Sequence, residues 1–495
     1  MADTLEVPPN LLVTTNSTTN TIGGNLSYSE PVGKTTYLEL NYAYNHSYTS
    51  TDKVANELLD GNNSNPIYRA DLSNDYHFTF TTNRVGLNFR GVKPKYNYIL
   101  GVGVLPSTLD GYSPTAAAAG IDASTHVTTV NFSPTARFVY NFARSNSLSF
   151  NYDGNSSQPS FSQLQPVVDF SNAQFPVQGN PNLKPSYTNN VSLRYNKFSI
   201  QTGNVLFTSI SFNQVNNQVV TNTVNFPDTL MNHPELKRYQ KTRLTEYLNA
   251  DGYYRVQGFL TYAKPWMDRR YTLFITGNLA YTNNIGYITD VDSVTAARTT
   301  QKNIAKTLTA TPGLSFRTDI TDIIDTRLFV NYSLTNIDNS INNRTSDLNS
   351  LGNHTRTLSF GVNGKNYLWK NWTVSYDFTR AVNYGYDPSL NVPNPNIFNA
   401  YIERRFLKNN VATLRASAFD IFNQNKGVSV TSSTASVTQQ VTNRLSRYFL
   451  LTFTLRLQKF AGRSPMQQDR GNFRRDGGGP PGGGFGGPGG GGPNE

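Results

Sequence analysis

The chain has 495 residues, of which 37% are hydrophobic, 12% aromatic and only 15% charged, and its formal net charge is +11. Soluble proteins usually carry about 25% charged residues, and one this poor in charge would need a larger apolar share. No run of about 18 apolar residues occurs, which excludes a transmembrane helix. Cysteine is absent, which excludes disulfides, thiolate metal sites and cysteine nucleophiles. This composition is typical of a β-sheet wall with one face in lipid and the other in water.

The beginning of the chain, MADTLEVPPN, contains neither a basic segment nor an apolar one, so it does not predict a signal peptide. We expect residues 1–19 to be a lead-in, either part of a surface loop or a truncated strand. We also expect the chain to be a fragment of a longer protein. The positive charge is spread along the sequence, whereas a nucleic-acid-binding protein would concentrate it.

Alternation of apolar and polar residues recurs along the chain, beginning with YLELNYAY (37–44). This period of two predicts strands with one apolar and one polar face. Residues of the two clearest segments, 371–380 and 447–457, are predicted to face lipid: Val374, Tyr376, Phe378, Phe449, Leu451, Phe453 and Leu455. The predicted strands number seventeen, at 20–30, 36–49, 76–90, 94–106, 126–142, 146–155, 186–197, 203–219, 250–264, 269–283, 301–316, 323–337, 352–367, 370–384, 396–407, 410–424 and 443–459. The segment NLLVTT (10–15) is the best candidate for a missed strand.

The predicted connections alternate between tight turns, such as LKNN (407–410), and long polar loops, such as 155–185, 220–249 and 284–300. Short turns on one side and long loops on the other are typical of an outer-membrane barrel whose short side faces the periplasm. The predicted fold is therefore all-β, an antiparallel transmembrane β-barrel of about 16–18 strands over residues 20–461. A soluble β-sandwich or solenoid also has alternating strands, but its strands are usually shorter.

The three tryptophans, Trp266, Trp369 and Trp372, all fall at or beside predicted short turns. We expect them to lie at one height, in the membrane interface, because an indole ring is apolar while its N–H requires a polar partner. Ordinary packing at turns is the alternative.

Residues 462–495 contain GGGPPGGGFGGPGGGGPNE, which cannot bury enough apolar area to offset its backbone entropy. We expect a disordered Gly/Pro/Arg-rich tail in the periplasm. Its net charge of +1 is too small to favour nucleic-acid binding.

No catalytic constellation is present in the sequence. The five histidines are scattered, and none has a partner at the spacing of a metal-binding helix. The carboxylates of TDITDIIDT (318–326) lack the spacing of a calcium loop. The sequence thus predicts no enzyme, no cofactor and no metal site.

Four stretches resemble one family: GNPNLKPSYTNNVSLRYN (179–196), LNADGYYRVQGFLTYAKPW (248–266), FDIFNQNKG (419–427) and RYFLLTFTLRLQKF (447–460). They look like the barrel of TonB-dependent receptors, in the branch of Bacteroidetes-type outer-membrane β-barrel proteins. The resemblance implies a 22-stranded barrel, an N-terminal plug through which TonB acts, insertion by the barrel-assembly machinery, and a bound small ligand. This sequence departs from that pattern in the expected absence of a signal peptide, a plug and the first strands.

The sequence leaves the function open among three readings. The first is a TonB-dependent transporter or receptor of the Gram-negative outer membrane, which binds its ligand with long surface loops and the lumen. The second is a non-transporting adhesin or scaffold barrel, and the third is a soluble β-rich carbohydrate-binding protein. The ligand itself is not readable from the sequence.

Overall fold

The computed structural model describes residues 11–456 except 59–65, 70–72, 115–116, 118–123, 166–167, 171, 173, 230–232, 342–353, 370, 387–389, 408–409 and 433–436. The predicted tail therefore lies outside the described residues. In the described part of the chain, no helix is long and apolar enough to cross a membrane.

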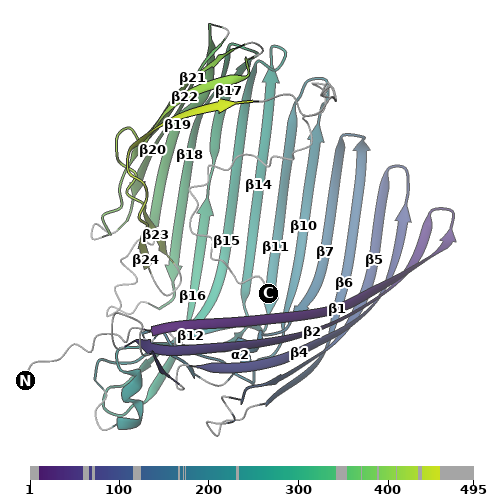
Figure 1. Ribbon diagram of the computed structural model, residues 1–495. Coiled ribbons are helices and arrows are strands. Elements are labelled where there is room, and N and C mark those ends of the chain that lie inside the picture. The colour runs from purple at the N-terminus through teal and green to yellow at the C-terminus, as the bar shows by residue number, and fades with distance from the viewer. Residues whose placement is uncertain are drawn as a thin grey trace, which may run out of the picture.

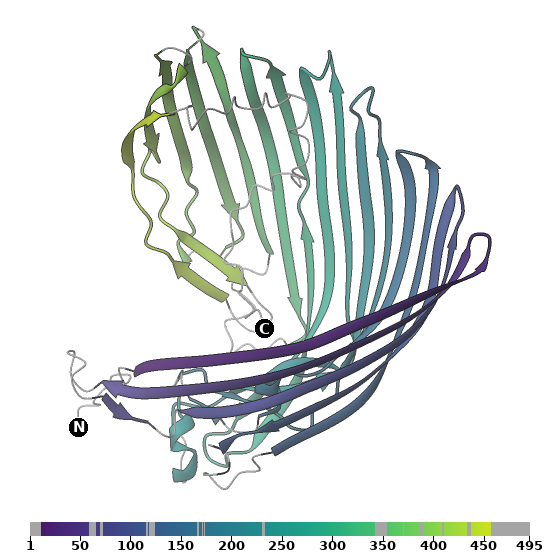
Figure 2. The same ribbon diagram turned by 45° about the vertical axis from the view of Figure 1, so that its right-hand side comes forward.

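One sheet contains 23 of the strands, and its continuous wall follows the chain order (Figures 1 and 2). The wall strands are β1 (Leu11–Gly33), β2 (Thr36–Leu58), β4 (Asn74–Val92), β5 (Tyr96–Tyr112), β6 (Ser124–Ala143), β7 (Asn146–Ser157), β10 (Ser186–Phe198), β11 (Val205–Asn216), β14 (Tyr253–Trp266), β15 (Tyr271–Val291), β16 (Arg298–Ala310), β17 (Gly313–Ile320), β18 (Ile324–Asn339), β19 (His354–Leu368), β20 (Trp372–Tyr384), β21 (Asn396–Phe406), β22 (Ala412–Phe419) and β25 (Tyr448–Leu455). Each pairs antiparallel with the next, except that β16 and β17 do not pair with one another and each pairs with both β15 and β18.

The predicted all-β antiparallel fold is confirmed, and each predicted strand corresponds to a wall strand. The predicted strand 301–316 is broken into β16 and β17, which both lie between β15 and β18. Thr311 and Pro312 separate the two, because proline has no N–H to donate to the ladder. Residues 11–15 of the segment NLLVTT are the start of β1 and not a separate strand, since residues 11–19 pair with residues 49–57 of β2.

The connections alternate as predicted, with tight turns at one end of the wall (the turn end) and longer connections at the other (the loop end). Two of the predicted long loops are wrong: the stretch 220–249 contains most of the strands Gln218–Asn225 and Arg243–Ala250, and residues 284–300 are not a long loop. β15 continues to Val291 and β16 begins at Arg298, because the polar segment beyond the apolar residues still forms an antiparallel ladder.

The two edges of the wall are β1 and β25. Among the described residues β1 pairs only with β2, and β25 only with β22. Figures 1 and 2 show these edges apart from one another. They run in the same direction, so an antiparallel closure between them requires an odd number of further strands.

The remaining elements gather at the loop end (Figure 1). They are β3 (Pro66–Tyr68), α2 (Phe161–Leu164), β8 (Val168–Asp169), β9 (Val177–Gln178), β12 (Gln218–Asn225), η1 (Pro234–Tyr239), β13 (Arg243–Ala250), β23 (Val428–Ser432) and β24 (Val437–Val441). The buried apolar clusters lie at this end as well, around Val224, Phe170, Leu164 and Val220. The rest of the wall is a single sheet, and no second layer of described residues covers either of its faces.

Candidate functional site: the polar face of the wall and its cap

The two faces of the wall differ in chemistry. On the apolar face, one row of register partners crosses six strands, from β15 to β21: Leu273, Phe316, Leu328, Val362, Phe378 and Phe398. Many side chains of this face are exposed, among them Leu314 and Leu328, whose exposed fractions are 51% and 52%. Water would make so large an exposed apolar surface unfavourable.

Aromatic side chains border this face at both ends. At the turn end, Trp266 lies with its ring centroid 6.1 Å from that of Tyr271. At the loop end, the ring of Tyr254 lies 6.4 Å from Phe212 and 6.0 Å from Tyr281. Tyr254 and Trp266 lie on the same face of β14, and the strand between them covers roughly 30 Å along the membrane normal at the usual tilt. This height is close to that of the lipid-facing band of outer-membrane barrels, which is about 25 Å.

The three tryptophans are at the turn end. Trp266 ends β14, Trp369 lies in the turn after β19, and Trp372 begins β20. Trp369 is 79% exposed. The guanidinium of Arg404 lies 5.2 Å from the ring centre of Trp372. The structure therefore brings the three to one end of the wall.

The residues predicted to face lipid lie on the apolar face. In β20, Val374, Tyr376 and Phe378 are opposite Asn366, Gly364 and Val362 of β19. The Tyr376 hydroxyl is hydrogen-bonded to Thr326 Oγ1 at 2.7 Å. In β25, the exposed fractions of Phe449, Leu451, Phe453 and Leu455 are 73%, 70%, 59% and 47%.

The polar face has a ladder of amides and hydroxyls. Asn190 Nδ2 donates to Asp153 Oδ2 at 2.9 Å, and Asn213 Nδ2 donates to Asn190 Oδ1 at 2.5 Å, so three neighbouring strands are linked. Further round the wall, Gln257 Nε2 donates to Asn278 Oδ1 at 3.3 Å. Such a surface is compatible with water or with a hydroxyl-rich ligand, and not with lipid.

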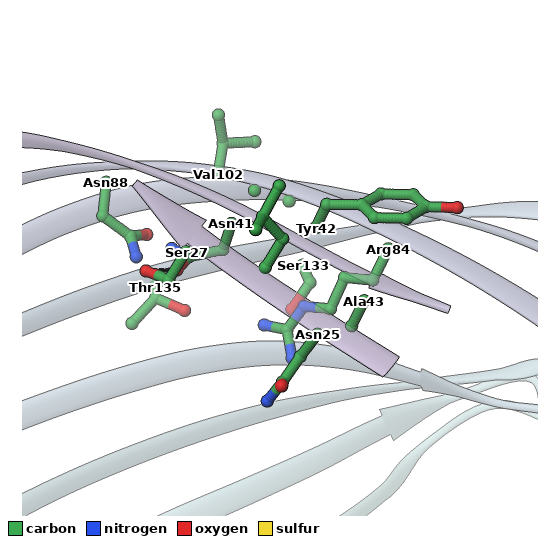
Figure 3. Close-up of a pocket in the computed structure, with 13 residues that line it drawn as sticks. Asn25, Ser27, Asn41, Tyr42, Ala43, Arg84, Asn88, Val102, Ser133 and Thr135 are labelled. Atoms are coloured by element: carbon green, nitrogen blue, oxygen red, sulfur yellow. Dashed lines mark hydrogen bonds between the residues drawn. The ribbon is translucent and has the colours of Figure 1, made fainter. Parts of the chain in front are cut away.

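A hollow of about 370 Å³ opens on this polar face across β1, β2, β4, β5 and β6. Its polar side chains are Asn25, Ser27, Asn41, Arg84, Asn88, Ser133 and Thr135. In Figure 3 the side chains of Asn25, Ser27 and Thr135 lie on one side of the sheet, and Val102 lies on the other. Gly86 and Gly103 are register partners in the middle of the hollow.

At the loop end, the described residues of 158–185 fold onto the polar face, and together with the described residues of 217–252 they form what we term the cap. Gln158 Nε2 donates to Ser107 Oγ at 2.9 Å and to Thr129 Oγ1. Leu164 and Leu183 are buried against Leu109 of β5. The cap is therefore held by packing as well as by hydrogen bonds.

The segment GNPNLKP (179–185) joins the first segment of the cap to β13 in the second. Asn180 Nδ2 donates to the Tyr247 carbonyl oxygen at 2.9 Å. The Asn249 amide bonds both backbone groups of Lys184, since its Oδ1 accepts from the N–H at 2.7 Å and its Nδ2 donates to the carbonyl at 2.9 Å. Pro185 then ends the loop, and β10 begins at Ser186, as predicted.

In the β12–β13 hairpin the order of the strands differs from that of the wall strands nearer the turn end. β14 is the neighbour of β15 near the turn end, but β12 takes that place near the loop end, where it pairs in parallel with residues 287–290. β13 pairs with β9 of the other cap segment instead. Positive φ angles at Asn217 (50°) and Gly252 (111°) allow the two crossings. The hairpin is thereby turned toward β9, in the other segment of the cap.

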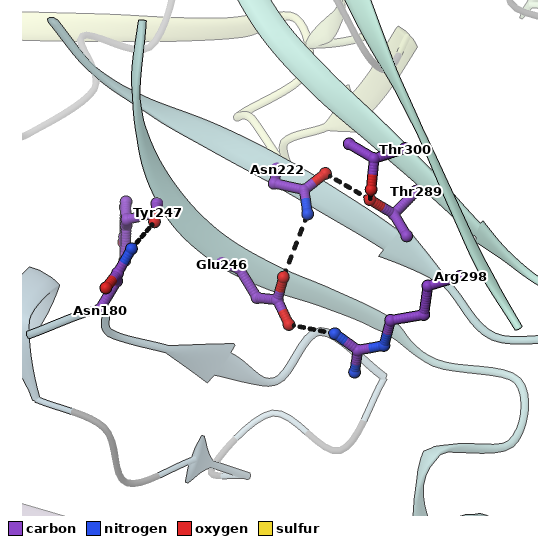
Figure 4. Close-up of polar contacts among 7 residues, drawn as sticks. All are labelled: Asn180, Asn222, Glu246, Tyr247, Thr289, Arg298 and Thr300. Atoms are coloured by element: carbon purple, nitrogen blue, oxygen red, sulfur yellow. Dashed lines mark hydrogen bonds and ion pairs between the residues drawn. The ribbon is translucent and has the colours of Figure 1, made fainter. Parts of the chain in front are cut away.

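A polar network joins the hairpin to the wall (Figure 4). Glu246 accepts from Arg298 Nη1 at 2.8 Å and from Asn222 Nδ2 at 3.1 Å. Asn222 Oδ1 in turn accepts from the hydroxyl of Thr289 at 2.9 Å. Asn222 and Thr289 are 3% and 1% exposed, so the network locks β12 against β15.

Comparison with protein families gives a match over residues 3–455 to the model of the "Outer membrane protein beta-barrel family". This chain belongs to that family. It is thereby placed in the outer membrane, and the wall described above is the wall of the barrel.

Solved structures give more distant likenesses to this outer-membrane barrel. A copper transporter, OprC, is 11% identical with a TM-score of 0.43, over 90% of this chain and 76% of that one. The siderophore receptor PirA from Pseudomonas aeruginosa is 11% identical with a TM-score of 0.31, over 90% and 80%. The RagAB peptide importer is 11% identical with a TM-score of 0.37, over 83% of this chain and 59% of that one. No curated protein matches the chain, so the family model alone carries the assignment.

Charged residues of the barrel near the turn end satisfy one another. Arg317 pairs with Asp325 at 2.9 Å and with Asp319 at 3.2 Å, so the carboxylates of 318–326 are partly neutralised by protein groups. Glu403 pairs with Arg415 at 2.5 Å and Arg405 at 3.2 Å. No group of metal ligands occurs among the described residues of the barrel.

Neither the hollow nor the exchanged strand order of the hairpin is predictable from the sequence. The hollow requires the register of five strands, which short-range patterns do not contain. Most of the β12–β13 hairpin lies within the predicted loop 220–249. The local signals of its two crossings are residue types that favour a positive φ, namely Asn217 and Gly252, which follows Asp251.

Proposed function

We propose that this chain forms the membrane wall and the ligand-binding surfaces of a TonB-dependent outer-membrane transporter or receptor. The observation that carries the proposal is a wall with one apolar face whose polar face holds a folded cap at one end. A ligand would be recognised by the cap and by the polar face, within a lumen that lipid does not enter.

The proposed orientation places the loop end at the cell surface and the turn end at the periplasm, together with the tail. Val374, Tyr376, Phe378 and the four predicted residues of β25 then contact lipid. The tryptophans of the turn end lie in the periplasmic interface. By the family resemblance, TonB would act through an N-terminal plug, and the barrel-assembly machinery would insert the wall.

The orientation can be tested by cysteine labelling, because the chain has no cysteine of its own. Val294→Cys lies in the connection 292–297 at the loop end, and Met267→Cys lies in the β14–β15 turn; both side chains are exposed, by 53% and 68%. A membrane-impermeant maleimide applied to intact cells should label the first variant and should label the second only after the outer membrane is opened. The opposite pattern would overturn the orientation.

Energised uptake is tested in the native host by measuring which solutes disappear from the medium. At least one solute should be depleted only when both the gene for this protein and TonB are intact. If depletion of every solute is unchanged by deletion of the gene, while surface adhesion is lost, the protein is an adhesin and not a transporter.

A further inference from the structure

The hollow on the polar face contains a cation without a counter-ion. Arg84 is exposed, and no described residue forms a hydrogen bond or an ion pair with its guanidinium. Arg90, on the same face of β4, is instead paired with Glu39 at 3.2 Å. None of the residues that line the hollow is acidic. The site thus has a net positive charge and would not hold a metal cation.

The rest of the lining consists of groups that bind hydroxyls. The side-chain amides of Asn25, Asn41 and Asn88 and the hydroxyls of Ser27 and Thr135 can donate and accept hydrogen bonds. Ser27 Oγ already donates to Asn41 Oδ1 at 2.7 Å, which leaves the Asn41 Nδ2 donor and the lone pairs of the Ser27 hydroxyl for a ligand. Asn25 and Arg84 lie in one register row, on either side of Ala43, and Figure 3 shows them with Ser27 and Thr135 around the hollow. A ligand with one anionic end and several hydroxyls would find a partner for each kind of group.

Packing of the wall does not require the glycines that leave the hollow open. A Cβ atom on Gly86 would have its nearest neighbour at 3.9 Å, and one on Gly103 at 3.5 Å, so both positions would tolerate a side chain. Gly101 differs, because a Cβ there would clash with the Asn88 side chain. Side chains at Gly86 and Gly103 would occupy the hollow without disturbing the sheet. A volume of about 370 Å³ lies within the range of about 300–1,000 Å³ that is typical of small-ligand sites.

We infer that this hollow binds a small polyhydroxylated carboxylate, such as a uronic acid, through Arg84. The guanidinium fork matches a carboxylate in two parallel hydrogen bonds, and the asparagines and hydroxyls take the ring hydroxyls. This inference rests on the proposed function and names the class of its ligand. The binding itself requires no energy coupling, so it can be measured on the isolated barrel.

The experiment uses the protein purified in detergent, and the probes are D-glucuronate, its uncharged methyl ester and inorganic phosphate. Dissociation constants are measured by ligand-observed NMR titration. Glucuronate should bind the unchanged protein, and both the Arg84→Gln substitution and the methyl ester should weaken binding about tenfold. Gly86→Val should also weaken it, because the side chain fills the hollow.

The matched control is Arg194→Gln. Arg194 lies in β10, on the same polar face of the wall as Arg84 but outside the hollow, and its register partners are Ser149 and Ser209. This substitution removes the same charge and should leave the dissociation constant within about twofold. Heat-modifiable gel mobility identifies any variant that fails to fold. Equal weakening by Arg84→Gln and Arg194→Gln overturns the inference, as does binding of phosphate in preference to glucuronate. If the purified protein binds glucuronate but cells show no TonB-dependent uptake of any solute, the proposed function is contradicted and this inference is not.

Discussion

Asn217 donates its backbone N–H to Oδ1 of Asp251 at 2.6 Å, and this bond ties together the two points at which the β12–β13 hairpin leaves the wall. Asn217 has a positive φ and Asp251 directly precedes Gly252, which has one as well. The carboxylate therefore fixes the base of a hairpin whose strand order is exchanged. The position of the hairpin over the polar face depends on this base and on the network around Glu246.

Asp251→Ala should loosen the hairpin without unfolding the barrel. The substitution leaves the Asn217 N–H without its acceptor, at a cost of about 1 kcal/mol, which is about fivefold in the population of open hairpin. Limited trypsin digestion of the folded protein should cut faster after Lys237 and Lys241. Asp228→Ala, which removes an exposed charge from the same connection, should leave the rate unchanged. Equal rates in the two variants would show that the bond does not hold the hairpin.

Gly179→Ala should detach the loop segment of the cap. A Cβ at this position would lie 2.6 Å from the Gln165 nitrogen and 2.8 Å from the Gln163 oxygen, and closer still to the Gln165 oxygen. These are backbone atoms, so the loop must move, at about 1–3 kcal/mol. Hydrogen exchange should quicken at residues 179–180, whose N–H groups donate to Gln165 and Gln163. Gly103→Ala, where a Cβ meets only ordinary contacts, is the control, and equal exchange in both would contradict the argument.

Features that depend on residues close together in the sequence could be predicted, and features that depend on distant residues could not. Strands such as 371–380 were predictable because lipid on one side and water on the other impose a period of two on the residues. GNPNLKP was predictable as a loop terminator, since Pro185 immediately precedes a strand. Its anchoring by Asn249 was not, because the two segments are 65 residues apart. The hollow around Arg84 likewise depends on strands whose register is set by the whole wall.

The stability of the turn between β15 and β16 should depend on the ionisation of Asp292, and so should fall only at acidic pH. Asp292 Oδ1 accepts from the Thr295 N–H at 2.7 Å, from the Thr295 hydroxyl at 2.8 Å and from the Val294 N–H at 3.0 Å. These bonds, the Thr295 N–H first, lower the pKa of Asp292 below its ordinary value. A lowered pKa means that the contribution to stability is complete above the ordinary carboxyl pKa and is lost as the pH falls through the lowered one.

Thr295→Ala removes the hydroxyl bond and should shift the pKa of Asp292 upward, toward its ordinary value. NMR titration of the Asp292 carboxyl resonance measures the shift. Thr299→Ala, in β16 and without a bond to Asp292, should leave the titration unchanged. An unchanged Asp292 titration in Thr295→Ala would show that the hydroxyl contributes nothing.

Phe378→Arg and Thr379→Arg place the same charge at adjacent positions of β20, on opposite faces. Phe378 lies in the apolar row between Val362 and Phe398, whereas Thr379 lies on the polar face. An arginine in lipid near the bilayer midplane costs about 2–4 kcal/mol, and one on the lumen side can remain hydrated. Urea titration of the barrel refolded in phospholipid vesicles should therefore show a large loss of stability for Phe378→Arg and a small one for Thr379→Arg. If the losses are equal, or their order is reversed, the apolar face does not contact lipid.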